Sequence, residues 1–557
     1  MPASLPSEDP KPTLSAPGGT LYERPERGAP GTTGLRATPV TPIAASVAAS
    51  VAAKSSPLPP ASPPPPASPA PSAHDRRALD RSFARGLAWT AGAKWLTQLF
   101  SWVATIAVAK LLAPADYGLV GMAAIVLGLV SLVSEFGIGT AIVTLRDLEE
   151  EDVAQINGFA LLLGAACFAV GCAAALPLGR FFRAPALPAV IIAQSTAFVL
   201  GAFQSVPSAL LQKELRFRVL AGIDVARSLV ASVAALTLAA LGAGYWALVL
   251  GEVIAGSAQS LMCIALRRHR FAVPQPQRLA RVLVFSWRAL VGRLSWYVYS
   301  NADFAIAGRR LGQAALGAYS FAWTLTTMPT EKLTALVARV SPAFFSAVQE
   351  DTVAVRRYLL LLTEGLALVT LPACVGLALV ADRFLPLVFG AKWNAAIVPL
   401  QLLTLSMALR AVITVVPNAL LAVGEARFLM YHGIGCAITF PIAFILGTRM
   451  GGISGLAAAW LVVYPLSVVP LLWRTFQRLL SPGDYVRAML PALHGVAVMT
   501  AVVLGVGAAL PARTPLLAAA GVALQVLAGA AAYSAVQWFG HRERTRYLLG
   551  ALAAARR

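Results

Sequence analysis

The sequence has few charged residues for its length. Only 13% of its 557 residues are Asp, Glu, Lys or Arg, whereas a soluble globular chain carries about 25%. In contrast, 58% of the residues are hydrophobic, and the mean hydropathy is +0.71. This composition argues against a soluble multidomain enzyme and indicates a polytopic α-helical membrane protein.

Side chains that usually carry catalytic or metal chemistry are scarce and scattered. The five cysteines lie in apolar runs without a C-x-x-C pair, and the five histidines are separated from one another. No Ser/His/Asp order, nucleotide-binding loop or metal-ligand cluster occurs in the sequence. We therefore expect no enzyme: no catalytic residue, no metal site and no cofactor. Without a nucleotide motif, any driving force must come from an ion gradient, the membrane potential or consumption of the product.

Acidic residues are outnumbered, so the formal net charge is +20. In a soluble protein such an excess would suggest nucleic acid as a partner, but here the basic residues are scattered and no nucleic-acid-binding motif accompanies them. In a membrane protein the same excess reflects Lys and Arg in cytoplasmic loops that face anionic lipid. We therefore expect membrane lipids, and no nucleic acid, as partners.

Residues 1–75 differ in composition from the rest of the chain. They hold 18 of the 38 prolines, including the run Pro63–Pro66. Such a segment cannot bury enough apolar surface to offset the entropy of ordering it. It also lacks the charged start, apolar stretch and small-residue cleavage site of a signal peptide. We expect a disordered, Pro-rich cytoplasmic tail.

Apolar runs of the length of a membrane-spanning helix fill the remainder of the chain. Between Leu87 and Trp538 they alternate with short polar or Gly/Pro breaks, and a helix needs about 20 apolar residues to cross a bilayer. The break at 450–452 is thin, so twelve spans stay open as an alternative. The pattern predicts an all-α polytopic membrane protein with about 14 transmembrane helices, at 87–112, 117–143, 155–178, 186–211, 218–241, 244–266, 282–308, 314–346, 357–380, 394–422, 428–447, 453–473, 488–510 and 515–538.

The basic residues between these spans predict an orientation. We leave out the tail and assign successive loops to alternate sides of the membrane. One side then has 24 Lys and Arg. The other side collects nine, namely Lys110, Arg180, Arg183, Arg309, Arg310, Arg383, Lys392, Arg449 and Arg513. The positive-inside rule then places both termini in the cytoplasm. We expect a multi-pass protein of a bacterial inner (plasma) membrane.

The membrane body contains an internal repeat. Residues 109–118 reappear as 308–317, at an offset of 199, and residues 206–211 reappear as 416–421. The matching segments occur in the same order and are six spans apart. Because six is an even number, both halves enter the membrane in the same direction. The predicted organisation is two parallel-repeat six-helix lobes plus two extra helices: a tail at 1–75, an N-lobe at 76–266, a basic cytoplasmic linker at 267–281, a C-lobe at 282–474, and spans 13 and 14 with a basic cytoplasmic tail at 475–557.

Several segments resemble one family of membrane proteins. They are KLLAPADYGLVGMA (110–123), SEFGIGTAIV (134–143), SVPSALLQKELRFR (205–218), GYWAL (244–248), NAD (301–303), GRRLGQAALGAYS (308–320) and FGAKW (389–393). The sequence is similar to the polysaccharide flippases of the multidrug/oligosaccharidyl-lipid/polysaccharide exporter superfamily, in the branch of the colanic-acid and other exopolysaccharide exporters. The resemblance covers about residues 87–480 and leaves out the tail.

The resemblance implies a function and a set of partners. Such proteins carry oligosaccharide repeat units linked to undecaprenyl diphosphate across the inner membrane by alternating access, for exopolysaccharide or lipopolysaccharide synthesis. The cargo would be a lipid-linked oligosaccharide. The polymerase and the chain-length proteins of the same pathway would be further partners.

Other functions stay open at this point. The same fold serves drug or cation antiporters and peptidoglycan-precursor flippases. A membrane polysaccharide polymerase or glycosyltransferase belongs to another class, but such enzymes carry a long extracytoplasmic loop, and the breaks here are short. A non-transporting scaffold that uses its tail for interactions is a further alternative.

A polar face along the seventh predicted span is the strongest site signal. At 100° per residue, Arg288, Tyr299 and Asp303 share one helix face. A charge at mid-membrane costs about 2.5–3.5 kcal/mol on insertion scales, so each such residue needs a reason. We expect this face to line the cargo cavity, where Arg288 and Arg293 would attract the diphosphate. Trp296 and Tyr299 would stack on sugar rings.

Two acidic residues are candidate coupling sites. Asp303 would bind a proton or cation, or would simply be the partner of a basic residue. Glu331, beside the helix-breaking Pro329, is the second candidate. Arg288 has the alternative of snorkelling to the membrane interface. The remaining cavity candidates are Asn301, Trp323 and Lys94.

Polar residues in other spans receive structural interpretations. Asp224 and Arg227 are three residues apart in the fifth span, and we expect them to neutralise each other. Gln194 and Gln204 are expected to join neighbouring helices rather than to hold sugar. Three single charges have no partner that the sequence assigns: Glu252, Glu364 and Arg410.

Overall fold

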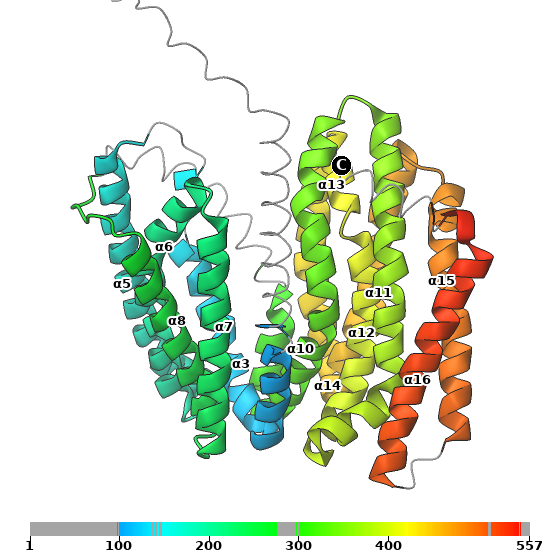
Figure 1. The fold of residues 1–557 in the computed structure, drawn as a ribbon, viewed down its shortest axis with the longest axis horizontal. Coiled ribbons are helices and arrows are strands. Elements are labelled where there is room, and N and C mark those ends of the chain that lie inside the picture. Colours follow the sequence, from blue (N-terminus) through cyan, green and yellow to red (C-terminus); the bar gives the residue numbers. More distant parts are fainter. Residues whose placement is uncertain are drawn as a thin grey trace, which may run out of the picture. The chain divides into compact units, whose positions relative to one another are not determined.

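The computed structural model describes residues 97–98, 100–135, 139, 142–143, 148–275, 297, 300–510, 514–544 and 546. These residues lie within one compact unit, Arg77–Arg557. Every regular element within the described residues is a helix and none is a strand, which confirms the all-α prediction (Figure 1). The predicted tail lies outside the described residues.

The helices before residue 267 form what we call the N-terminal group. Within it, α5 packs along α6, α7 along α8, and α6 along α8. Its helix α5 begins with a capping box, in which the side chain of Asp152 accepts a hydrogen bond from the backbone of Glu149. The group consists of the helix Phe100–Leu111, α3 (Pro114–Glu135), α5 (Glu150–Phe182), α6 (Leu187–Lys213), α7 (Phe217–Ala240) and α8 (Trp246–Leu266).

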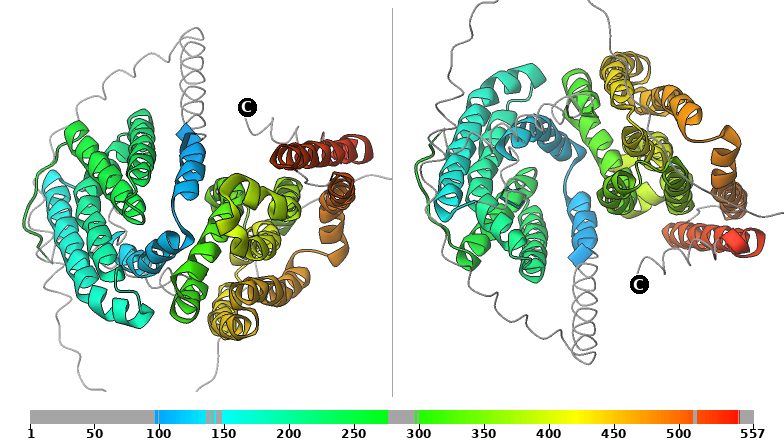
Figure 2. Two further views of the ribbon diagram at one scale, coloured as in Figure 1. Left: turned by 90° about the horizontal axis from the view of Figure 1, so that it is seen from below. Right: turned by 90° about the horizontal axis from the view of Figure 1, so that it is seen from above.

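The helices after residue 301 form the C-terminal group. Helix α11 packs against α12 and α15, and α12 packs against α14. Seen along the bundle, α15 and α16 (orange and red) lie at its edge (Figure 2). The group consists of α10 (Ala302–Ala347), α11 (Thr352–Phe389), the 3-10 helix η1 (Ala391–Ala396), α12 (Ile397–Ile413), α13 (Val416–Ala422), α14 (Ala426–Arg478), α15 (Pro482–Ala509), α16 (Pro515–Ala535) and the π-helical turn η2 (Val536–Gly540).

Two of these helices, α10 and α14, are too long to cross a bilayer once. A straight helix with the 53 residues of α14 would be about 80 Å long, whereas the hydrocarbon core is about 30 Å thick. Helix α14 instead doubles back at Gly451 and Gly452, where the backbone is not helical. The two arms then lie side by side, as the hydrogen bond from His432 to the carbonyl of Ser467 shows. The thin break that the sequence predicts at 450–452 is therefore a turn between two antiparallel arms.

Helix α10 doubles back in the same way at Gly312. This glycine has a φ of 83°, a conformation that a residue with a Cβ rarely adopts. The turn brings Tyr319 of the second arm to Asp303 of the first arm. Both turns fall in breaks that the sequence predicts, at 309–313 and 448–452.

The described residues contain ten helical segments that are long and apolar enough to cross a membrane, a count that leaves out α10 and counts α14 once. This finding supports a multi-pass membrane protein. The total of 14 spans stays a prediction, because residues 87–96 and 282–296 lie outside the described residues.

The two copies of the sequence repeat touch each other. Helix α3 packs closely along α10. A Cβ on Gly118 would lie 1.8 Å from the carbonyl oxygen of Gln313, and a Cβ on Gly317 would lie 1.7 Å from that of Pro114. Positions 118 and 317 differ by the repeat offset of 199. Glycine at equivalent positions thus allows two equivalent helices to cross in a reciprocal contact, the close approach on which helix packing in lipid depends.

Part of the predicted linker lies against the N-terminal group. Residues 268–275 are not helical. The side chain of Asn157 donates a hydrogen bond to the carbonyl of Arg270, and the backbone N–H of Gln275 donates one to the side chain of Gln155. The start of α5 therefore anchors this segment.

Candidate functional site

The carboxylate of Asp303 is fully buried inside the C-terminal group. It accepts hydrogen bonds from the hydroxyl of Tyr319 at 2.7 Å and from the indole Nε1 of Trp460 at 2.9 Å. The backbone N–H of Phe304 donates a third, at 2.9 Å. Tyr319 reaches Asp303 through the turn in α10, and Trp460 comes from the second arm of α14. Three donors thus satisfy a carboxylate that would otherwise be costly to bury.

Arg410 of α12 lies among the faces of aromatic rings. Its guanidinium carbon is 4.5 Å from the ring centroid of Trp460, 5.5 Å from that of Trp323 and 5.7 Å from that of Tyr464. The guanidinium of Arg410 forms no ion pair or hydrogen bond with a residue that the structure describes. Rings interact with a guanidinium through their faces and take none of its N–H donors, which can therefore bind an anion in a bidentate manner.

Trp460 joins the two charged groups. Its N–H holds Asp303, while its ring face lies under Arg410. The ring is 1% exposed. It packs against the rings of Phe440 and Phe444, with centroid distances of 5.0 Å to each. We call these residues the Asp303–Arg410 cluster: Asp303, Tyr319, Trp323, Arg410, Trp460 and Tyr464.

Of the predicted site residues whose side chains the structure describes, Asp303 and Trp323 enter this cluster and Asn301 does not. The side chain of Asn301 donates to the carbonyl of Tyr297 at 3.0 Å, one turn earlier in the chain. Glu331 lies within α10, and its side chain lies outside the described part of the structure. The other predicted residues lie outside the described residues: Lys94, Arg288, Arg293, Trp296 and Tyr299. Their proposed roles stay predictions.

The single charges left without partners in the sequence have partners in the fold. Glu252 of α8 pairs with Arg227 of α7 at 2.6 Å, so the expectation that Arg227 pairs with Asp224 is wrong. The helix contact between α7 and α8 decides this pairing, and the spacing along one helix does not reveal it. Glu364 pairs with Arg544 near the end of the chain. Arg410 has the aromatic rings described above. The single charge of Arg410 in an apolar run was therefore the sequence feature that pointed to this cluster.

A basic residue of the C-terminal group holds the end of the first described helix. The ammonium of Lys392 donates to the carbonyls of Lys110 and Leu112, both at 2.6 Å. The indole of Trp393 donates to the carbonyl of Ala109 at 3.1 Å. A cation at the C-terminal end of a helix satisfies free carbonyls and complements the helix dipole. We call Lys392 and Trp393 the outer clamp, since they tie the two helix groups together at one end.

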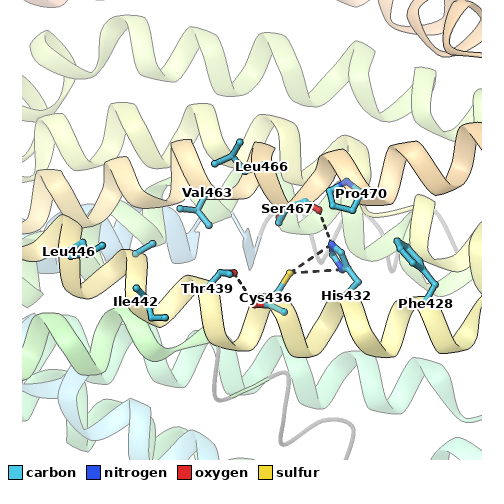
Figure 3. Close-up of a pocket in the computed structure, with 12 residues that line it drawn as sticks. Phe428, His432, Cys436, Thr439, Ile442, Leu446, Val463, Leu466, Ser467 and Pro470 are labelled. Carbon is cyan, nitrogen blue, oxygen red and sulfur yellow. Dashed lines mark hydrogen bonds between the residues drawn. The ribbon is translucent and has the colours of Figure 1, made fainter.

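A groove of about 560 Å³ lies between the two arms of α14 (Figure 3). Apolar side chains line most of it, among them Ile442 and Leu446 from one arm and Val463 and Leu466 from the other. His432 donates to the carbonyl of Ser467 across it at 2.7 Å. Its other polar side chains bond along their own helix, as Thr439 does to the carbonyl of Gly435, so the groove offers little polar chemistry to a ligand.

Comparison with known proteins agrees with this architecture. Residues 107–398 match the family described as polysaccharide biosynthesis protein. The chain is 26% identical over 392 residues to the lipopolysaccharide biosynthesis protein WzxC of Escherichia coli (strain K12), which covers 69% of this chain and 79% of WzxC. It is 25% identical over 404 residues to the succinoglycan biosynthesis transport protein ExoT of Rhizobium meliloti (strain 1021), covering 71% of this chain and 81% of ExoT.

Among solved structures, the lipid II flippase MurJ in an inward closed conformation superposes with a TM-score of 0.66 at 12% identity. That match covers 82% of this chain and 100% of the MurJ chain, and at this identity it establishes a shared fold. The family match spans more than half of the sequence and includes both copies of the repeat contact at Gly118 and Gly317. The chain belongs to the polysaccharide biosynthesis protein family.

Proposed function

We propose that this protein is a flippase, which carries lipid-linked oligosaccharide repeat units across the membrane by alternating access of its two helix groups. The observation that carries the proposal is the Asp303–Arg410 cluster: an acidic and a basic side chain, joined through Trp460, inside an apolar helical bundle. Because charges in the membrane are costly, they mark pathways for polar cargo or ions. The relatives named for polysaccharide biosynthesis and transport support this cargo class.

Arg410 is the residue that we assign to the diphosphate. Three aromatic rings surround its guanidinium, and its N–H donors are left for phosphate oxygens. Arg288, Arg293 and Lys94 remain proposed as further cations along the path. A cage that holds an arginine favours an anionic cargo, so it disfavours the alternative of a cationic-drug antiporter.

Asp303 is the residue that we assign to coupling. Ionised, its carboxylate accepts hydrogen bonds from Tyr319 and Trp460. A proton or cation arriving at Asp303 would compete for the same oxygen, weaken the hold on Trp460 and thereby alter the surface on which Arg410 lies. Glu331 stays a second coupling candidate.

The proposed location is the inner membrane of a bacterium, with both termini in the cytoplasm. The excess of Lys and Arg on one side of the predicted spans supports this orientation. In that orientation the outer clamp and the turns at Gly312 and Gly452 face away from the cytoplasm. The polymerase and chain-length proteins of the same pathway are the proposed protein partners.

Replacement of Arg410 tests the proposal in cells. In a strain that lacks its own flippase and expresses the full chain, Arg410→Ala should abolish surface polymer and cause lipid-linked repeat units to accumulate, at an unchanged protein level. Arg410→Lys should retain part of the export, because Lys supplies the charge but not the planar fork.

Arg449→Ala is the matched control. This arginine is exposed at the end of the first arm of α14, so its loss should leave export normal. Normal polymer in the Arg410→Ala strain would refute the assignment of the diphosphate to Arg410.

A further inference from the structure

A second polar site lies inside the N-terminal group. A pocket of about 350 Å³ opens between α3, α6, α7 and α8. This volume is at the lower end of the range of about 300–1,000 Å³ for small-molecule sites. We call it the N-terminal pocket, and its polar lining consists of Ser131, Gln194, Gln204, Arg227, Glu252 and Gln259.

The ion pair in this pocket requires a polar environment. Arg227 lies near the middle of α7 and Glu252 in the first half of α8, and their side chains are 37% and 57% exposed. An ion pair that lies within membrane-spanning helices and is this exposed is costly against acyl chains. Its presence indicates that the pocket holds water or a polar cargo.

The glutamines of this pocket have unused hydrogen-bonding capacity. The Oε1 atom of Gln204 is buried and has no hydrogen-bond partner within the described part of the chain. Gln194 and Gln259 likewise form no hydrogen bond with a described residue. A buried acceptor without a partner is rare in a native protein and needs an explanation.

Two other buried glutamines, Gln525 and Gln537, also have an Oε1 atom without a hydrogen-bond partner among the described residues, but their side-chain NH2 groups are used. The side-chain amide of Gln525 donates to the carbonyl of Val503, and that of Gln537 donates to the carbonyl of Pro491. Those two join neighbouring helices, the role that the sequence suggested for Gln194 and Gln204. The pocket glutamines are not used in that way, so helix packing does not account for them.

The chemistry of the pocket differs from that of the Asp303–Arg410 cluster. The charges of Arg227 and Glu252 cancel, so the pocket is neutral overall. Each carboxamide carries both donors and an acceptor, which matches the hydroxyl groups of a sugar. The cluster around Arg410, in contrast, presents a cation to an anion.

The pocket also adjoins a contact between α3 and Tyr297, a residue that precedes α10 in the chain. The hydroxyl of Tyr297 donates to the carbonyl of Ile125 at 2.8 Å. A Cβ on the pocket residue Gly128 would lie 2.0 Å from that hydroxyl. A cargo in the pocket therefore lies beside a contact that a change between inward and outward states would alter.

We infer that the N-terminal pocket binds sugar residues of the cargo, while Arg410 binds its diphosphate. The inference rests on the proposed function and adds a glycan subsite to it. Recognition of the lipid-linked oligosaccharide is thereby divided between the two helix groups, with hydroxyls bound in one and phosphate in the other.

Binding to the purified full chain in lipid nanodiscs tests this division with two probes. One probe is the lipid-linked oligosaccharide extracted from the source organism, and the other is bare undecaprenyl diphosphate. The double variant Gln194→Leu/Gln204→Leu should weaken binding of the oligosaccharide probe by about tenfold, since each lost hydrogen bond costs a few-fold in affinity. Binding of bare undecaprenyl diphosphate should not change.

Two further variants complete the experiment. Gln212→Leu, on the same helix but exposed near its end, is the matched control and should bind both probes normally. Gln259→Leu, on α8, gives an independent test if the double variant does not fold, and should weaken only the oligosaccharide probe.

The outcomes separate the two proposals. Equal losses for both probes, or no loss for either, would overturn the glycan subsite. Native protein that binds both probes equally well would also overturn it and leave the proposed function intact. Native protein that binds neither probe would contradict the proposed function itself.

Discussion

Asp303 and Arg410 lie on different helices, and Trp460 touches both. The indole donates to the carboxylate through its edge and carries the guanidinium on its face. The ring of Trp460 is 1% exposed and cannot move freely. A change at either charged group therefore alters the contacts of the other through this ring. This arrangement gives a physical route between a coupling event and the release of an anion.

Asp303→Asn separates a coupling role from a structural one. Asn cannot ionise, so transport by the variant in vesicles should no longer depend on the pH difference across the membrane. Hydrogen bonds to a charged group are worth about 1.5–3 kcal/mol, so the variant should also unfold at a lower temperature.

Tyr319→Phe is the matched control for this measurement. It removes one hydrogen bond to Asp303 but keeps the carboxylate. It should lower the unfolding temperature and retain the pH dependence. If Asp303→Asn slowed transport by the same factor at every pH difference, Asp303 would be structural only.

The sequence could reveal these residues only in part. Asp303 stands out because a carboxylate is expensive in an apolar run, and Trp323 was one of the remaining cavity candidates. Arg410 also stands out as a charge, but its partners come from α10 and α14. Which helices pack together is a property of the tertiary fold, so neither this cage nor the pairing of Arg227 with Glu252 follows from spacing.

At the scale of elements, glycine determines where helices turn and where they cross. The turns at Gly312 and Gly452 use positive φ values of 83° and 57°. The crossing of α3 and α10 instead uses the missing side chains of Gly118 and Gly317. The breaks in hydropathy predicted the turns, and the repeat predicted that positions 118 and 317 are equivalent, but their mutual contact became visible only in the fold.

Gly317→Ala should destabilise the protein and separate α3 from α10. The new Cβ would lie 1.7 Å from a backbone oxygen, and backbone cannot move aside as a flexible side chain can. Overpacking of this kind costs about 1–3 kcal/mol, to be measured as a lower unfolding temperature of the purified chain.

Gly365→Ala is the control, because nothing lies within 4 Å of the Cβ that it adds to α11. It should be neutral or slightly stabilising, as Ala is the better helix former. Gly118→Ala should reproduce the effect of Gly317→Ala. Equal stability of Gly317→Ala and Gly365→Ala would show that the crossing does not depend on glycine.

At the scale of the whole molecule, several side chains connect the two helix groups near one end of the bundle. The outer clamp ties Lys392 and Trp393 to the first described helix, and the ring of Tyr117 lies 5.3 Å from that of Trp393. Alternating access requires these contacts to break when the opposite side closes. Hydrogen bonds between a side chain and carbonyls suit that purpose, since water can replace the protein partners.

Transport in vesicles that contain only the purified full chain tests the central claim most directly. Extracted lipid-linked oligosaccharide is placed in the inner leaflet, and its arrival in the outer leaflet is measured by cleavage with an added glycosidase. We predict arrival well above that in protein-free vesicles, and a loss of about tenfold or more for Arg410→Ala, in keeping with the value of a charge-assisted hydrogen bond. Arrival no faster than in protein-free vesicles would contradict the account.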